Sequence, residues 1–186
     1  MNPTPEMNET LQELIDHHEI RKLLSVYCHG CDRGDEYRMA GVYREDAWDD
    51  HGSYKGPARE FAKFVMNAFA TRRELLKGVH LLGQSLIRVI GNAAGAETYF
   101  IASSVVATEG GRKVVNLLSG RYVDNLVREN GQWRISKRVC VRDWSISLNV
   151  EKDWLENGNF VEGEMSGKDP SYAILGLEHP GLPLGS

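Results

Sequence analysis

The stretch Ile20-Arg-Lys-Leu-Leu-Ser-Val-Tyr-Cys-His-Gly-Cys-Asp-Arg-Gly34 decides how the rest of this chain is organised. Its apolar residues recur at helical spacing and predict one buried stripe, formed by Ile20, Leu23, Leu24, Tyr27 and Cys31. Gly34 follows the last of them and is the expected C-terminal cap. We therefore predict a helix from about Leu11 to Arg33, with Asn8 or Thr10 as its N-cap.

Asp32 lies in the last turn of that predicted helix, at the edge of the apolar stripe. The helix dipole is negative there and disfavours a carboxylate, and burial adds a desolvation cost unless the charge finds a partner. We expect a cationic or hydrogen-bonding partner, and His80 is the best candidate in the chain. A histidine oriented by a carboxylate is the usual general base. Spacing alone leaves the pairing open, because Asp49 or Asp50 could also serve His80.

Length and composition indicate one globular domain. The chain has 186 residues, of which 41% are hydrophobic and 26% charged, which is ordinary for such a domain. The net charge of −4 argues against a nucleic-acid partner. No apolar run is long enough to span a bilayer, so no membrane partner is expected. Three cysteines are too few for a disulfide framework, which predicts a reduced, cytoplasmic protein.

The first half of the chain is expected to be mainly helical. Residues 1–10 are polar and predicted to be frayed, and the domain itself is assigned to residues 11–147. A short second helix is expected from about Glu36 to Tyr43. Aromatic and turn residues then mix in Ala47–Pro57, which suits a strand or hairpin, and Pro57 opens a third predicted helix.

The second half has the pattern of a β-meander. The segments 81–90, 96–108, 113–128 and 132–147 are rich in Val, Ile, Tyr, Ser and Thr. They are separated by the hairpin signals Gly91-Asn92, Glu109-Gly-Gly111 and Glu129-Asn-Gly131. Three helices followed by four antiparallel strands predict an α+β fold with the helices packed on one face of a curved sheet. Such a sheet with a helix across it encloses a cone-shaped cavity suited to a small molecule.

The tail, residues 148–186, lacks periodicity and contains many breakers, yet it carries Trp154, Phe160 and Tyr172. We expect an ordered C-terminal arm that wraps the domain or a neighbouring subunit, with loose residues after Gly181.

Two further motifs admit more than one interpretation. Cys28-His-Gly-Cys31 resembles a redox or zinc pair, but it lies inside a predicted helix and no second such pair completes a metal site. We therefore predict no metal and no cofactor. Arg138 has the opposite strand parity to Trp133 and Ile135, so it projects either into the cavity or onto the solvated face.

Several of these residues carry a resemblance to a known family. The chain resembles the SnoaL-like, scytalone-dehydratase-like branch of the nuclear-transport-factor-2-like superfamily. The matching stretches cover roughly Leu11 to Tyr172, nearly the whole chain. They are Ile20-Arg-Lys-Leu with Tyr27 and Asp32, Gly52-Ser-Tyr-Lys-Gly-Pro57, His80 before a strand, Gly120-Arg-Tyr, Gly131-Gln-Trp-Arg-Ile-Ser-Lys-Arg138 and Gly167-Lys-Asp-Pro-Ser-Tyr172.

The resemblance implies a cone-shaped α+β barrel whose pocket holds an Asp–His dyad in members that eliminate water or hydrogen halide. On this basis Asp32 and His80 match the dyad. The same resemblance implies substrate-binding roles for residues placed in the pocket, namely Tyr27, Trp48, Tyr54 and Arg138. The second histidine and the tyrosine-rich water clamp of scytalone dehydratase are not evident here.

These observations predict a cofactor-independent lyase that acts on a cyclic or polycyclic small molecule, with His80 as the base and Asp32 fixing its tautomer. An isomerase or cyclase of the same fold, or a non-catalytic ligand-binding protein, is the alternative, because the fold by itself fixes no reaction. Strands such as Val114–Val127 carry apolar residues on both faces, and relatives bury the outer face between subunits. A homo-oligomer, trimer or dimer, is therefore expected.

Overall fold

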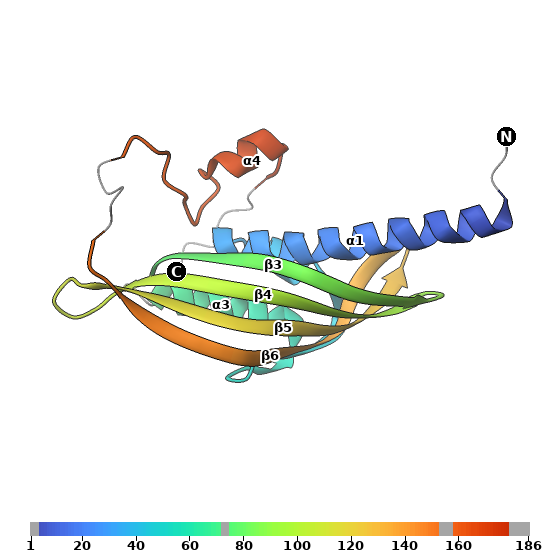
Figure 1. Cartoon of the computed structure of the whole chain (residues 1–186), viewed down its shortest axis with the longest axis horizontal. Coiled ribbons are helices and arrows are strands. Elements are labelled where there is room, and N and C mark those ends of the chain that lie inside the picture. Colours follow the sequence, from blue (N-terminus) through green and yellow to red (C-terminus); the bar gives the residue numbers. More distant parts are fainter. Residues whose placement is uncertain (1–3, 72–74, 153–157, 179–186) are drawn as a thin grey trace.

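The computed structural model describes residues 4–71, 75–152 and 158–178. Its fold is α+β, as predicted, with helices packed against one curved sheet (Figure 1). The strand order is β2-β1-β6-β5-β4-β3, so β2 and β3 form the two edges and the sheet does not close into a barrel. The predicted loose residues after Gly181 lie outside the described part of the chain.

Helix α1 (Pro5–Arg33) lies along the sheet and carries the stretch that organises the fold (Figure 1). It ends at Gly34 as predicted, and Gly34 has the left-handed conformation (φ 68°) that glycine adopts without strain. The helix begins six residues earlier than predicted. Thr4, rather than Asn8 or Thr10, is the N-cap, because its side chain accepts a hydrogen bond from the backbone N–H of Met7.

The connection from α1 to the meander contains two helices and, between them, a hairpin. Helix α2 (Glu36–Ala40) ends earlier than predicted, since Gly41 is its C-cap and Tyr43 already begins strand β1 (Tyr43–Asp50). Strand β2 (Lys55–Pro57) pairs antiparallel with β1. Pro57 is the last residue of β2, and helix α3 (Ala58–Thr71) starts directly after it.

The predicted meander is present as β3 (Leu75–Ile90), β4 (Ala93–Ala107), β5 (Lys113–Glu129) and β6 (Gln132–Val150), all paired antiparallel in sequence order. His80, expected just before a strand, lies within β3 because that strand begins at Leu75. Strand β1 adds to the far side of β6 in parallel. The sequence did not indicate this parallel pairing, since β1 and β6 are far apart in the chain and no local turn joins them.

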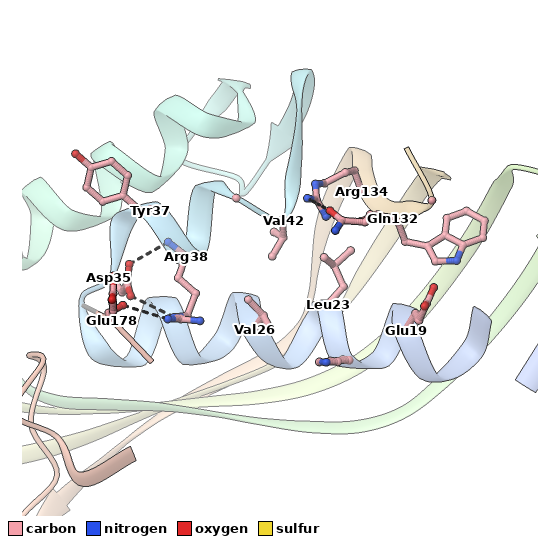
Figure 2. A pocket seen from close by; sticks show the side chains of 14 residues that line it. Glu19, Leu23, Val26, Asp35, Tyr37, Arg38, Val42, Gln132, Arg134 and Glu178 are labelled. Atoms are coloured by element: carbon pink, nitrogen blue, oxygen red, sulfur yellow. Dashed lines mark hydrogen bonds and ion pairs between the residues drawn. The ribbon is translucent and has the colours of Figure 1, made fainter. Parts of the chain in front are cut away.

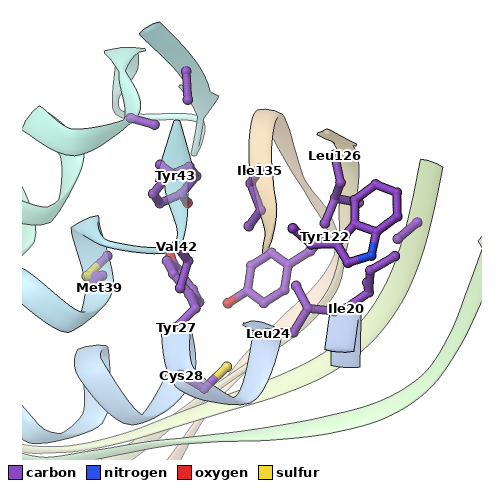
Figure 3. Close-up of a cluster of buried hydrophobic side chains, with 14 of the residues drawn as sticks. Ile20, Leu24, Tyr27, Cys28, Met39, Val42, Tyr43, Tyr122, Leu126 and Ile135 are labelled. Atoms are coloured by element: carbon purple, nitrogen blue, oxygen red, sulfur yellow. The ribbon is translucent and has the colours of Figure 1, made fainter. Parts of the chain in front are cut away.

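The main core lies between the helices α1, α2 and α3 and the sheet, and Figure 3 shows part of it. Ile20 and Leu24 of α1 are at most 1% exposed, and they face a sheet side built from Tyr122, Leu126 and Ile135. Burial of such side chains contributes about 1.5–3 kcal/mol each to folding. Beyond the C-terminal end of α1 the strands β3–β6 continue, and there the sheet is covered only in part (Figure 1). No helix of the described residues is long and apolar enough to cross a membrane.

Candidate active site

Asp32 and His80 form a hydrogen-bonded pair where the last turn of α1 meets strand β3. The Nδ1 atom of His80 lies 2.5 Å from Asp32 Oδ1, and the backbone N–H of His80 donates to Asp32 Oδ2 at 2.9 Å. The second bond is available because β3 is an edge strand, so its outer N–H groups have no neighbouring strand. The expected contact is therefore present. The last turn of α1, where the helix dipole disfavours a carboxylate, places Asp32 against His80.

The alternative partners of His80 are engaged elsewhere. Asp49 is fully buried, accepts a hydrogen bond of 2.6 Å from the Tyr43 hydroxyl and pairs with His51 through Oδ1. Asp50 accepts hydrogen bonds from the Lys55 ammonium group and the backbone N–H of Gly52. Both interactions lower the pKa of the Asp50 carboxyl group.

The pairing determines which nitrogen of His80 can act as a base. Asp32 accepts a hydrogen bond from Nδ1 of His80. The neutral imidazole therefore carries its proton on Nδ1, and Nε2 has a free lone pair. Nε2 makes no hydrogen bond to any of the residues that the structure describes. The side chains of His80 and Asp32 are 17% and 10% exposed, so the pair is partly shielded from solvent but reachable.

The dyad lines a pocket of about 520 Å³ on the concave side of the sheet. Two rows of register partners cross it, His80–Ala102–Leu118–Ser145 and Gly78–Ser104–Asn116–Ser147. Phe69 of α3 and Met165 of the C-terminal arm also line it. Ser145 and Ser147 remain exposed, so the pocket is open at that end and not the enclosed cavity we expected.

The arm reaches this pocket from the same chain. Its helix α4 (Pro170–Leu175) lies beside the C-terminal end of α1 (Figure 1). Arg33 pairs with Asp169 at 3.2 Å, His29 contacts the Ser171 hydroxyl at 3.1 Å, and the Tyr172 hydroxyl donates to Asp35 at 3.0 Å. Burial opposes ionisation of Asp169, but hydrogen bonds from Ser171 and Glu164 and the charge of Arg33 lower its pKa to about 2. These contacts hold Met165 at the mouth of the pocket.

The four residues assigned to substrate binding do not line the dyad pocket. Trp48 is 49% exposed and lies outside the pocket, because its neighbours Ala47 and Asp49 take the inward positions of β1. The hydroxyl of Tyr54 donates to the carbonyl of Pro57 at 2.8 Å, and its ring packs on Phe61. The resemblance placed these side chains in the pocket, whereas the fold directs Tyr54 into local packing and leaves Trp48 half exposed.

Tyr27 and Arg138 are core residues. Arg138 is fully buried, and its guanidinium group donates to both Asp124 oxygens at 2.7 and 2.8 Å and lies over the Tyr27 ring. Burial by itself would lower the pKa of Arg138, but Asp124 raises it well above its ordinary value. Tyr27 is 2% exposed, and its hydroxyl lies 3.4 Å from His51 Nε2. Parity left two directions open for Arg138, and a register shift in β6 between Ile135 and Lys137 turns it inward, where Asp124 already neutralises its charge.

Sequence reasoning missed Arg142 as a lining residue of the dyad pocket. It lies four positions after Arg138 on β6, so parity could have indicated that the two arginines share a face. What the pattern could not indicate is that α1 covers one of these arginines and not the other.

Three potential metal ligands lie together at the dyad, namely Cys31, Asp32 and His80. The direct 2.5 Å contact between Nδ1 and Oδ1 is shorter than the separation of two ligands on one ion, which is about 3 Å or more. Burial raises the pKa of the Cys31 thiol, so this group stays protonated and binds metal poorly. The residues therefore fit a proton-transfer dyad better than a metal site, and the absence of a metal requirement stays a prediction.

A larger pocket of about 670 Å³ lies on a different side of α1 (Figure 2). Leu23, Val26 and Val42 form its apolar part, and Arg38 pairs with Asp35 at 3.2 Å beside it. None of the described residues that line it is a histidine or a cysteine. It therefore offers less for proton transfer than the dyad pocket, despite its volume.

Together, the curved sheet and the helix that covers it define an α+β protein of the nuclear-transport-factor-2-like class. Residues 12–139 match the model of the SnoaL-like domain. The chain belongs to this family. No curated protein is similar to it in sequence.

Solved structures share the fold at low sequence identity. A hexachlorocyclohexane dehydrochlorinase, LinA type 2, superposes with a TM-score of 0.67 and 18% identity, over 80% of this chain and 99% of that one. A candidate scytalone dehydratase from Novosphingobium aromaticivorans superposes with a TM-score of 0.65 and 18% identity, over 76% of this chain and 93% of that one. A protein of unknown function from Mycobacterium tuberculosis, Rv3472, superposes with a TM-score of 0.61 and 26% identity, over 72% of this chain and 75% of that one. Proteins that share this fold thus include a dehydrochlorinase and a protein of unknown function.

Proposed function

We propose that this protein is a cofactor-independent lyase, a dehydratase or a dehydrohalogenase, that acts on a cyclic or polycyclic small molecule. One observation carries the proposal, namely the hydrogen bond between Asp32 and His80 Nδ1, which leaves Nε2 free in a pocket of about 520 Å³. The dehydrochlorinase and candidate dehydratase among the similar structures support the reaction class.

In this mechanism His80 Nε2 removes a proton from a substrate carbon next to the one that bears the leaving group. Asp32 stabilises the resulting imidazolium and prevents the ring from turning, since both its oxygens bond to the same residue. The C–H electron pair forms the double bond while the leaving group departs with its own bonding pair. Where that group is hydroxide, the imidazolium can return the proton and release water.

The pocket offers no alternative covalent route among the described residues. Cys31 is the one cysteine of the lining, and burial raises its pKa, which disfavours the thiolate. The serines lie on extended strands, not in a strand–turn–helix elbow beside an oxyanion hole. Proton transfer from carbon is therefore the chemistry that these residues support best.

The experiment follows both the proton and the leaving group. Cyclic β-hydroxyketones and chlorocyclohexanes are incubated with the protein in D₂O, in the presence of excess chelator, and the products are analysed by NMR and mass spectrometry. We expect expulsion of water or halide with formation of a ring double bond. Deuterium incorporation into the recovered substrate with nothing expelled would show proton abstraction without elimination, and would favour the isomerase. A strict metal requirement would contradict the assignment of the site.

The outer face of the sheet supports a further part of this proposal, a homo-oligomer. Its exposed apolar residues alternate along the strands with the pocket-lining ones and include Leu81, Tyr99, Ile101 and Trp144, all 39–68% exposed. Large contiguous apolar patches usually mark interfaces. We propose that subunits associate through this face, as trimers or dimers.

Light scattering at micromolar concentration should therefore return two or three times the single-chain mass of 20.9 kDa. Ile101→Lys, at the centre of the face, should shift the protein towards the single chain, because a buried unpaired charge is costly. Leu14→Lys, on the exposed side of α1, is the matched control and should leave the mass unchanged. A wild-type mass near that of one chain would contradict the assembly.

A further inference from the structure

Arg142 lines the dyad pocket with a positive charge that no carboxylate neutralises among the described residues. Its Nε and Nη2 atoms donate to one neutral acceptor, the Ser145 hydroxyl, at 3.2 and 3.1 Å. The adjacent acid, Asp143, is held by Arg121 at 3.0 Å. Arg121 also pairs with Glu97 at 2.9 Å. Arg142 is thus the one lining arginine or lysine of the described pocket, and its remaining N–H groups are available to a ligand.

This charge lies across the pocket from the catalytic pair. The register row His80–Ala102–Leu118–Ser145 places Ser145, the partner of Arg142, three strands away from His80. Three strand spacings amount to roughly 14 Å along the sheet, and the curvature and the side chains shorten the gap. A cation at this distance does not act on the reacting carbon. It can bind the opposite end of a substrate whose rings span the pocket.

The surroundings of Arg142 divide into a polar and an apolar part. On the polar side, the Ser147 hydroxyl donates to Asn116 Oδ1 at 2.6 Å, so the Asn116 amide presents its NH₂ group to the pocket. On the apolar side, Leu118 and Ala102 lie between this polar strip and His80. A ring system would cover the apolar residues, while a charged oxygen would meet the donors.

We infer that Arg142 is the specificity residue of this pocket and that the substrate carries an anionic oxygen group, a carboxylate or phenolate, on a system of at least two fused rings. The inference rests on the function proposed above and adds the substrate class. Guanidinium remains charged at every physiological pH, and its planar fork matches two oxygens of a carboxylate. The resemblance implied a substrate-binding role for Arg138, but Arg142 is the arginine that lines this pocket.

Binding of two probes tests this inference without any turnover. Isothermal titration calorimetry compares 2-naphthoate with its neutral methyl ester. The wild-type protein should bind the anion about tenfold more tightly, since a charge-assisted hydrogen bond in a partly exposed site is of that order. Arg142→Gln should abolish the preference, whereas Arg142→Lys should restore part of it. Lys137→Gln removes one charge from the exposed side of the same strand and should leave the preference intact.

Equal affinity of the wild type for both probes, no saturable binding of 2-naphthoate, or an undiminished preference in Arg142→Gln would each overturn the inference. The dyad is tested separately, because His80→Ala should retain the anion preference while it loses turnover. A failed Arg142 experiment therefore leaves the proposed lyase intact. If His80 and Asp32 prove not to catalyse turnover, the anion preference can likewise still be measured.

Discussion

Replacing His80 with alanine should slow turnover of an identified substrate by about a hundredfold to ten-thousandfold, the usual contribution of a general base. The substitution removes the one nitrogen that faces the pocket with a free lone pair, and it leaves the Asp32 carboxylate without a side-chain donor. Because His80 is an edge-strand residue whose backbone bond to Asp32 survives, we expect the fold to persist. The measurement is kcat, with circular dichroism and thermal melting to establish folding.

His51→Ala is the matched control for this experiment. His51 is also a histidine paired with an aspartate, and it stacks on Phe61 at 4.1 Å between ring centroids, but it does not line the dyad pocket. This change should lower the stability and leave the chemical step largely intact. Wild-type turnover by the His80 variant, or loss of turnover in a folded His51 variant, would transfer the role of base to the second pair.

Asp32→Asn should reduce turnover by about a hundredfold or more, although the side-chain shape is almost unchanged. In the native protein the backbone N–H of His80 donates a hydrogen bond to Asp32 Oδ2 at 2.9 Å. In the variant, the amide oxygen of the new asparagine can accept this hydrogen bond. Its NH₂ group then faces Nδ1 and donates to it. That arrangement forces the imidazole proton onto Nε2, which is the wrong tautomer for a base at the pocket.

The tautomer is directly observable. Nitrogen-15 NMR of the histidine rings should show protonation at Nδ1 of His80 in the wild type and at Nε2 in Asp32→Asn. Asp49→Asn makes the same change in the second pair and should not alter the His80 signals. An Asp32→Asn protein with wild-type kcat, or with an unchanged tautomer at His80, would show that Asp32 does not orient the base.

The local sequence determined the elements that carry the site. The apolar stripe with Gly34 after it specifies where α1 ends, because periodic burial and a left-handed cap are both local properties. The hairpin signals specify the meander in the same way, and Asn130-Gly131 adopts the positive φ values that such a turn requires. Asp32 was identifiable as a residue in need of a partner from its position alone.

Pairings between distant segments were decided only by the tertiary structure. The parallel contact of β1 with β6 and the choice of Asp32 over Asp49 or Asp50 as the partner of His80 depend on how α1 lies on the sheet. Arg138 and Arg142 illustrate the physical reason. The register of β6 places both on the concave face, but α1 covers the first and buries it against Asp124, whereas the sheet extends beyond the helix at the second. The alternation of a strand specifies a face, and only three-dimensional packing specifies which part of that face becomes core and which becomes pocket.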